Sequence, residues 1–111
     1  MHITLIKKIK SDGAPCRKCA EVEQRLTESG LMHRIDRVVI ADEREPQGEG
    51  IALARKHGVD TAPFFIVQPD EGPAQIYTVY FRFLKEVLRQ ESSEQEEIAE
   101  IMARNPDLDF I

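Results

Sequence analysis

The stretch HITLIKKIKSDGAPCRKCAEVEQRL, residues 2–26, changes its pattern once, and this change decides the fold. Its first eight residues are rich in β-branched side chains, which predicts a strand, and the SDGAP that follows has the composition of a turn. Beyond the turn, Cys19, Val22 and Leu26 recur at helical spacing, and Gly30 is placed to end the helix. A strand, a turn and a helix therefore follow one another, with a pair of cysteines where the helix begins.

The remainder of the chain continues this alternation of strands and helices. The expected elements are a strand at 33–41, a helix at 49–59, strands at 63–68 and 74–80, a helix at 79–90 and a C-terminal helix at 92–104. Within the second strand, we expect Val38, Val39 and Ile40 to be buried. The turn-forming residues PDEGP, between the third and fourth strands, predict an antiparallel hairpin.

The order of these elements predicts the class of fold. A strand–helix–strand start implies two parallel strands joined by a right-handed crossover. The closing hairpin adds antiparallel neighbours, so we expect an α/β protein with a mixed four-stranded sheet flanked by helices. The length of 111 residues is enough for one hydrophobic core and too short for two ordinary domains.

Composition and charge narrow the range of functions. The apolar runs are only as long as strands, and the N-terminus lacks the pattern of a signal peptide, so we expect a cytoplasmic protein without a membrane partner. The net charge of −5 argues against nucleic acid as a partner, because nucleic-acid affinity comes mainly from phosphate neutralisation. One end of the chain is nevertheless basic, which indicates either a solvated strand end or a surface that attracts anionic substrates. Its cations are Lys7, Lys8, Lys10, Arg17 and Lys18.

Cys16 and Cys19 are the only cysteines, and in a reducing compartment such a pair is more often catalytic, redox-sensing or metal-binding than structural. The first N–H groups of a helix lack partners and carry partial positive charge, so a Cys16 thiolate is stabilised there. The charges of Arg17 and Lys18 are expected to add to this effect. Cys19, one turn further on, is expected to be shielded, which gives an exposed nucleophile and a protected resolving thiol.

Two other interpretations of the cysteine pair compete with this one. A structural zinc site normally needs four ligands, and the histidines that could complete it, His33 and His57, fall at a strand start and a helix end. We therefore predict no metal site. A pair with a purely structural role stays open.

A second informative stretch is VDTAPFF, residues 59–65, because a proline directly before a buried strand cannot donate a hydrogen bond to the sheet. Together with the C-x-x-C motif of Cys16 and Cys19, Pro63 makes the chain resemble the thioredoxin superfamily, and its size is similar to that of the compact glutaredoxin-like members. The resemblance implies a thioredoxin-like three-layer sandwich, to which the expected C-terminal helix is an addition. It also implies a cis peptide bond before Pro63.

The same resemblance implies a substrate-binding site. The backbone of Ala62 would face Cys16 and pair with an extended segment of the substrate, which aligns a disulfide for attack. In this interpretation Cys16 and Cys19 are the catalytic residues. The substrate-binding residues are Arg17, Lys18, Thr61, Ala62 and Pro63.

The resemblance implies a thioredoxin/glutaredoxin-like domain, residues 1–90. We expect the remainder, residues 91–111, to be a C-terminal helical extension packed on the same domain. It implies a thiol–disulfide oxidoreductase that reduces or exchanges the disulfides of proteins or glutathione mixed disulfides. Glutathione or a reductase would supply the electrons, and no cofactor is required. The chain departs from the family in having no tryptophan and in lacking the Gly-Gly and aspartate with which glutaredoxins hold glutathione.

Two further functions are compatible with the same residues. Some glutaredoxin-like proteins carry an iron–sulfur cluster between two subunits, with one cysteine from each. The chain could instead be a non-catalytic, redox-responsive binding module built on the same fold.

Overall fold

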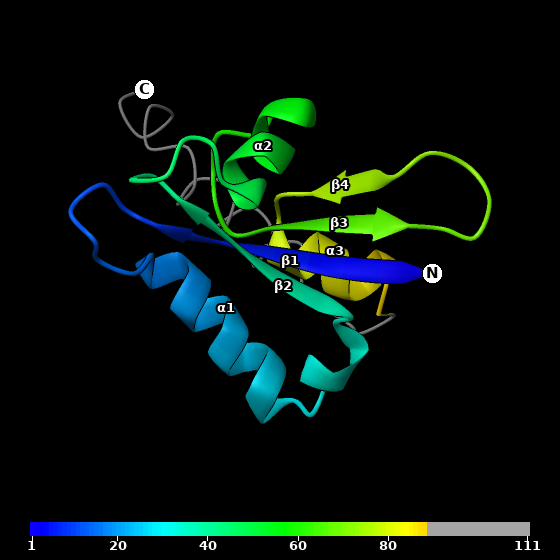
Figure 1. The fold of residues 1–111 in the computed structure, drawn as a ribbon. Coiled ribbons are helices and arrows are strands. Elements are labelled where there is room, and N and C mark those ends of the chain that lie inside the picture. Colours follow the sequence, from blue (N-terminus) through cyan, green and yellow to red (C-terminus); the bar gives the residue numbers. More distant parts are fainter. Residues whose placement is uncertain (89–111) are drawn as a thin grey trace, which may run out of the picture.

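The computed structural model describes residues 1–88, so the expected C-terminal helix at 92–104 and the extension at 91–111 lie outside the described residues. In chain order, the elements are β1 (His2–Ile9), α1 (Arg17–Glu28), the short 3₁₀ helix η1 (Met32–Arg34), β2 (Arg37–Asp42), α2 (Glu49–Lys56), β3 (Phe64–Gln68), β4 (Gln75–Tyr77) and α3 (Tyr80–Glu86). The expected alternation of strands and helices is therefore confirmed over this range (Figure 1).

The four strands form one mixed sheet in the order β2-β1-β3-β4. β1 pairs in parallel with β2, and Leu5 lies opposite Val38. β3 pairs with β1 and with β4 in antiparallel fashion, so the expected hairpin is also confirmed. Figure 1 shows β2 and β4 at the two edges of the sheet.

Helices cover both faces of the sheet and create two hydrophobic clusters. The first cluster joins β1 and β3 to α1 and α3, and its centre is a stack of Phe65 on Phe83 with ring centroids 3.8 Å apart. The second joins β1, β2 and β3 to α2 through Ile6, Val39 and Phe64. Layers of helix, sheet and helix result. Within residues 1–88, no helix combines the length and hydrophobicity needed to cross a membrane.

The second strand differs from its expected form. It starts at Arg37 and not at position 33, because η1 occupies part of the preceding segment. Val39 is buried as expected, but the prediction that Val38 and Ile40 are buried is wrong, since their exposed fractions are 41% and 48%. β2 is an edge strand that packs on α2 with one face only, and no β2 residue belongs to the cluster of α1 and α3.

Gly50 allows α2 to approach β2 closely. A Cβ atom at this position would lie 2.3 Å from the carbonyl oxygen of Ile40 and 2.5 Å from the Cα atom of Ala41. Real Cβ atoms do not come so near to backbone atoms, so only glycine fits this helix–strand contact. α2 leads directly to the segment that precedes β3, and the contact therefore fixes the start of that segment.

An ion pair holds the same helix to the start of β2. The guanidinium of Arg37 donates two hydrogen bonds to Glu49, one of them at 2.6 Å, and lowers the pKa of this carboxyl below its ordinary value. A carboxyl whose pKa is lowered in the folded state stabilises the fold at pH values above the ordinary pKa of glutamate, about 4.3. This stabilisation is lost as the pH falls through the lowered pKa.

We expect a Glu49→Gln variant to lose this contribution at every pH, so its melting temperature should depend less on pH than that of the parent between roughly pH 6 and pH 3. The measurement is a series of thermal melts across this range. Glu71→Gln removes an exposed acid that has no ion pair among the described residues, and serves as the control. Equal pH dependence in all three proteins would contradict the assignment.

Candidate functional site

A tight turn between β1 and α1 sets the position of Cys16. The N–H of Lys10 donates to the carbonyl of Ala14 at 2.9 Å, and the Asp12 carboxylate accepts from the Ala14 N–H at 2.9 Å. Pro15 then forms an isolated bridge with Ile9. The chain enters α1 directly after this bridge, so Cys16 becomes the N-cap residue of the helix, as the sequence predicts.

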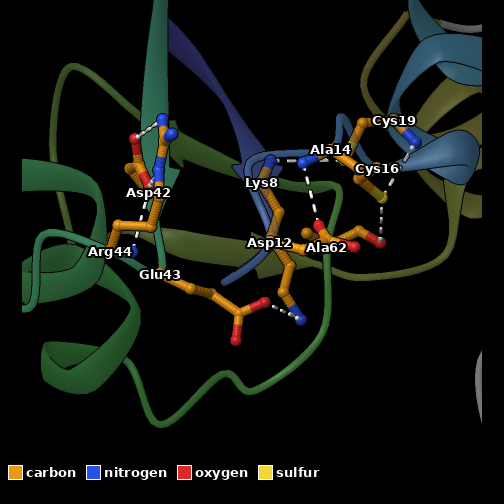
Figure 2. Close-up of polar contacts among 9 residues, drawn as sticks. All are labelled: Lys8, Asp12, Ala14, Cys16, Cys19, Asp42, Glu43, Arg44 and Ala62. Atoms are coloured by element: carbon orange, nitrogen blue, oxygen red, sulfur yellow. Dashed lines mark hydrogen bonds and ion pairs between the residues drawn. The ribbon is translucent and has the colours of Figure 1, made fainter.

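The Cys16 sulfur lies between two backbone groups (Figure 2). It accepts a hydrogen bond from the N–H of Cys19 at 3.3 Å, in the way that a serine or aspartate oxygen caps a helix. As a thiol it donates to the carbonyl oxygen of Ala62 at 3.8 Å. One contact suits the thiolate and the other suits the thiol, so the half-buried sulfur has a partner in both protonation states.

Cys19 lies one turn further into the helix and is buried, with an exposed fraction of 3%. Its sulfur accepts a hydrogen bond from the N–H of Lys8, at 3.4 Å. The carbonyl of the same residue accepts the N–H of Cys16 at 3.2 Å. The main chain of Lys8 therefore contacts both cysteines and fixes them to the end of β1.

One hollow borders the cysteine pair, and a second lies beside Ala62. The first, called here the cysteine hollow, has a volume of about 210 Å³ and lies between β1, β2 and α1; it is lined by Lys7, Lys8, Ile9, Pro15, Cys16, Cys19, Ala20, Glu23 and Ile40. The second has a volume of about 220 Å³, lies beside α2 and includes Thr61 and Ala62 in its wall. Lys8 lines both hollows, so the end of β1 separates them.

The segment before β3 lies opposite Cys16, as the resemblance implies. The peptide bond between Ala62 and Pro63 is cis, which confirms that expectation. Pro63 is buried, and the carbonyl of Ala62 points to the Cys16 sulfur. Thr61 is part of the wall of the neighbouring hollow. The structure therefore brings Cys16 close to Ala62, which is 46 positions away in the sequence.

The side chains of Arg17 and Lys18 take no part in the contacts of the Cys16 sulfur described above. The Arg17 side chain is 93% exposed, and its guanidinium pairs with Glu21 at 3.4 Å. Lys18 is half-buried, and neither cation makes a polar contact with the Cys16 sulfur. These polar contacts of the sulfur are therefore with backbone groups, and a role of Arg17 and Lys18 in substrate binding stays a prediction.

Sequence reasoning missed the ion pair between Lys8 and Glu43, whose Nζ and Oε1 atoms are 3.4 Å apart (Figure 2). Both residues line the hollow beside Thr61 and Ala62. Successive side chains of β1 point to opposite faces of the sheet, so Lys8 lies on the face that α2 covers. This alternation could have been used to predict the side of the sheet on which Lys8 lies. Glu43 comes from a loop that the sequence marks only as polar, so its position depends on the pairing of β1 with β2.

Among residues 1–88, no group of three or more His, Cys, Asp or Glu side chains is placed to hold a metal ion. The candidate site consists of the two thiols, the backbone groups that contact them, the cysteine hollow and the neighbouring hollow beside Ala62. No family model, curated protein or solved structure matches the chain.

Proposed function

We propose that this protein is a thiol–disulfide oxidoreductase with a thioredoxin-like fold, in which Cys16 attacks a disulfide and Cys19 resolves the product. The observation that carries the proposal is the position of the Cys16 sulfur, which caps α1, accepts the Cys19 N–H at 3.3 Å and lies 3.8 Å from the Ala62 carbonyl oxygen. A thiolate is the reactive form of cysteine, and backbone N–H groups at a helix N-terminus stabilise it.

The arrangement of the whole domain supports the thioredoxin-like identity. The sheet order β2-β1-β3-β4, with one parallel and two antiparallel pairings, resembles the core of that superfamily. The cysteine pair lies at the β1–α1 junction, and Pro63 precedes β3. Both motifs of the resemblance therefore occupy positions that suit the proposed chemistry.

In the first step, the Cys16 thiolate attacks one sulfur of a substrate disulfide. A bond forms between the Cys16 sulfur and that substrate sulfur, the substrate disulfide bond breaks, and the second substrate sulfur leaves as a thiolate. The Cys19 N–H stabilises the attacking anion through the contact already present. An extended substrate segment pairs with the backbone of the half-buried Ala62, which orients its disulfide toward Cys16.

In the second step, the Cys19 thiolate attacks the Cys16 sulfur of the mixed disulfide. The Cys16–Cys19 disulfide forms, and the remaining substrate sulfur leaves as a thiolate. Cys19 is shielded from competing disulfides by its burial, and the Lys8 N–H stabilises its anion. Two electrons from glutathione or from a reductase then return both cysteines to thiols.

The proposal is tested by equilibrating the protein in glutathione buffers that span roughly −150 to −300 mV, then alkylating the free thiols and measuring the mass. We expect molecules with two alkylated thiols to be replaced, in one two-electron transition, by molecules with none. The same titration in denaturant is the control. Because unfolding removes the backbone contacts of both sulfurs, the midpoint is expected to differ between the folded and unfolded chains.

Two results would count against the oxidoreductase. A pair that stays reduced across the whole range has no accessible disulfide form. Identical midpoints for the folded and unfolded chains would show that the contacts around Cys16 and Cys19 do not influence exchange.

A further inference from the structure

β2 presents an apolar surface at an open edge of the sheet. In the described residues no strand pairs with its outer side, and Val38 and Ile40 are exposed large hydrophobic side chains. Both point to the α1 face, because they lie opposite Leu5 and Lys7 of β1, which face α1. An exposed edge of this kind is a template for pairing with another strand.

The charges around this strand favour a second copy of the chain as the occupant. Two β2 strands can pair in antiparallel fashion about Ile40, so that each Ile40 lies beside the partner's Ile40. Val39 then lies opposite the partner's Ala41. Arg37 lies opposite the partner's Glu43, which directly follows β2 and whose N–H still donates to the carbonyl of Ile9 in β1. Directly opposed residues point to the same face of the sheet, and this condition holds here because Arg37 and Glu43 both face α2, where they pair with Glu49 and Lys8.

We propose that the protein forms a dimer through antiparallel pairing of β2 about Ile40, which joins the two sheets into one. The pairing is self-complementary, because Arg37 meets the partner's Glu43 at one end and Glu43 meets the partner's Arg37 at the other. Opposite charges across paired strands are favourable, and like charges there are unfavourable. The apolar contact of the two Ile40 side chains removes a surface that is costly to leave in water.

The dimer would also change the surroundings of the cysteines. Ile40 lines the cysteine hollow, so the partner's Ile40 lies next to one wall of that hollow. The dimer itself does not depend on the proposed oxidoreductase activity, because its contacts involve neither sulfur. Its failure or success is therefore independent of the redox titration described above.

The experiment is sedimentation equilibrium of the full chain at concentrations up to the order of 1 mM, where weak self-association becomes visible. We expect the parent protein to dimerise. We expect Ile40→Lys, which places two ammonium groups at the symmetry axis, to be monomeric across the range. Gln75→Lys puts the same charge on the other edge strand, β4, and is expected to dimerise like the parent.

A charge exchange tests the register. In a dimer of the Arg37→Glu variant, two acidic side chains face each other at each end of the paired strands. In a dimer of the Glu43→Arg variant, two cations face each other there. Each variant is therefore expected to bind itself roughly fivefold or more weakly than the parent. In a mixed dimer of the two variants, unlike charges face each other at both ends. An equimolar mixture is therefore expected to regain dimers. Circular dichroism of each variant checks that the fold is retained.

Each outcome decides the proposal. A monomeric parent at all concentrations overturns it. A parent dimer that survives Ile40→Lys assigns self-association to another surface and also overturns it. Dimers that are not regained on mixing the Arg37→Glu and Glu43→Arg variants overturn the pairing about Ile40.

Discussion

A Cys16→Ser variant is expected to lose turnover of a mixed-disulfide substrate by roughly a thousandfold or more, because a serine hydroxyl is not ionised at neutral pH and cannot displace a thiolate. The substitution replaces the capping sulfur by a hydroxyl oxygen, and serine is among the preferred residues at a helix N-cap. The fold is therefore expected to survive while the chemistry is lost. The measurement is the steady-state rate with a glutathionylated peptide and excess glutathione.

The matched variant is Cys19→Ser, which keeps the nucleophile and removes the resolving thiol. It is expected to perform the first attack and then to accumulate a covalent adduct at Cys16, visible as an increase in mass equal to one substrate thiol. The Cys19 N–H that contacts Cys16 belongs to the backbone, so this contact is retained. Adduct in Cys19→Ser and none in Cys16→Ser is the expected pattern.

Glu21→Gln provides a control for surface charge at the same helix, because it removes the partner of Arg17 and leaves both sulfurs unchanged. Its turnover is expected to stay within a few fold of the parent. If Cys16→Ser turned over the substrate as fast as the parent, Cys16 would not be the nucleophile. An adduct on Cys19 in the Cys16→Ser variant would reverse the two assigned roles.

A Gly50→Ala variant is expected to lower the free energy of unfolding by about 2 kcal/mol, which is within the range of about 1–3 kcal/mol measured for overpacked sites. The new methyl group would lie 2.3 Å from the Ile40 carbonyl oxygen, so α2 has to move away from β2. Helix propensity alone gives the opposite sign, since replacing glycine by alanine within a helix stabilises it by about 1 kcal/mol. Urea denaturation measures the difference.

The sign of the change therefore separates the two effects. Ala52→Gly, at an exposed position of the same helix, makes the reverse substitution without a close contact, and is expected to cost about 1 kcal/mol. Destabilisation by both variants is the expected result. A more stable Gly50→Ala protein would mean that α2 is not held as tightly against β2 as the contact distances require.

The sequence alone predicts much of this fold, since local signals determine where the elements begin and end. The change of pattern after the β1 segment defines α1, and Gly30, which has positive φ, follows the end of α1 as expected. The cysteine positions follow from the same signals, because a turn before a helix places Cys16 at its N-cap. Residues 61–63 could be placed only through the resemblance.

Features that depend on the order of the strands in the sheet could not be predicted from local sequence signals. The run Val38, Val39, Ile40 is apolar throughout, as in a strand buried on both faces. Its place at the edge of the sheet leaves alternate side chains exposed, and no local pattern reveals an edge. The requirement for Gly50 likewise comes from the distance between α2 and β2, which is a property of the assembled sheet.

The way in which Lys8 contacts both cysteines has a consequence for how this protein can change over evolutionary time. Its N–H and C=O hold the two sulfur-bearing residues, and every amino acid except proline supplies both groups. Mutational drift at position 8 can therefore replace the lysine and its pairing with Glu43 while the spacing of the thiols is preserved. Selection would maintain the main-chain hydrogen bonds at this position, and these bonds do not require a particular amino acid in related sequences.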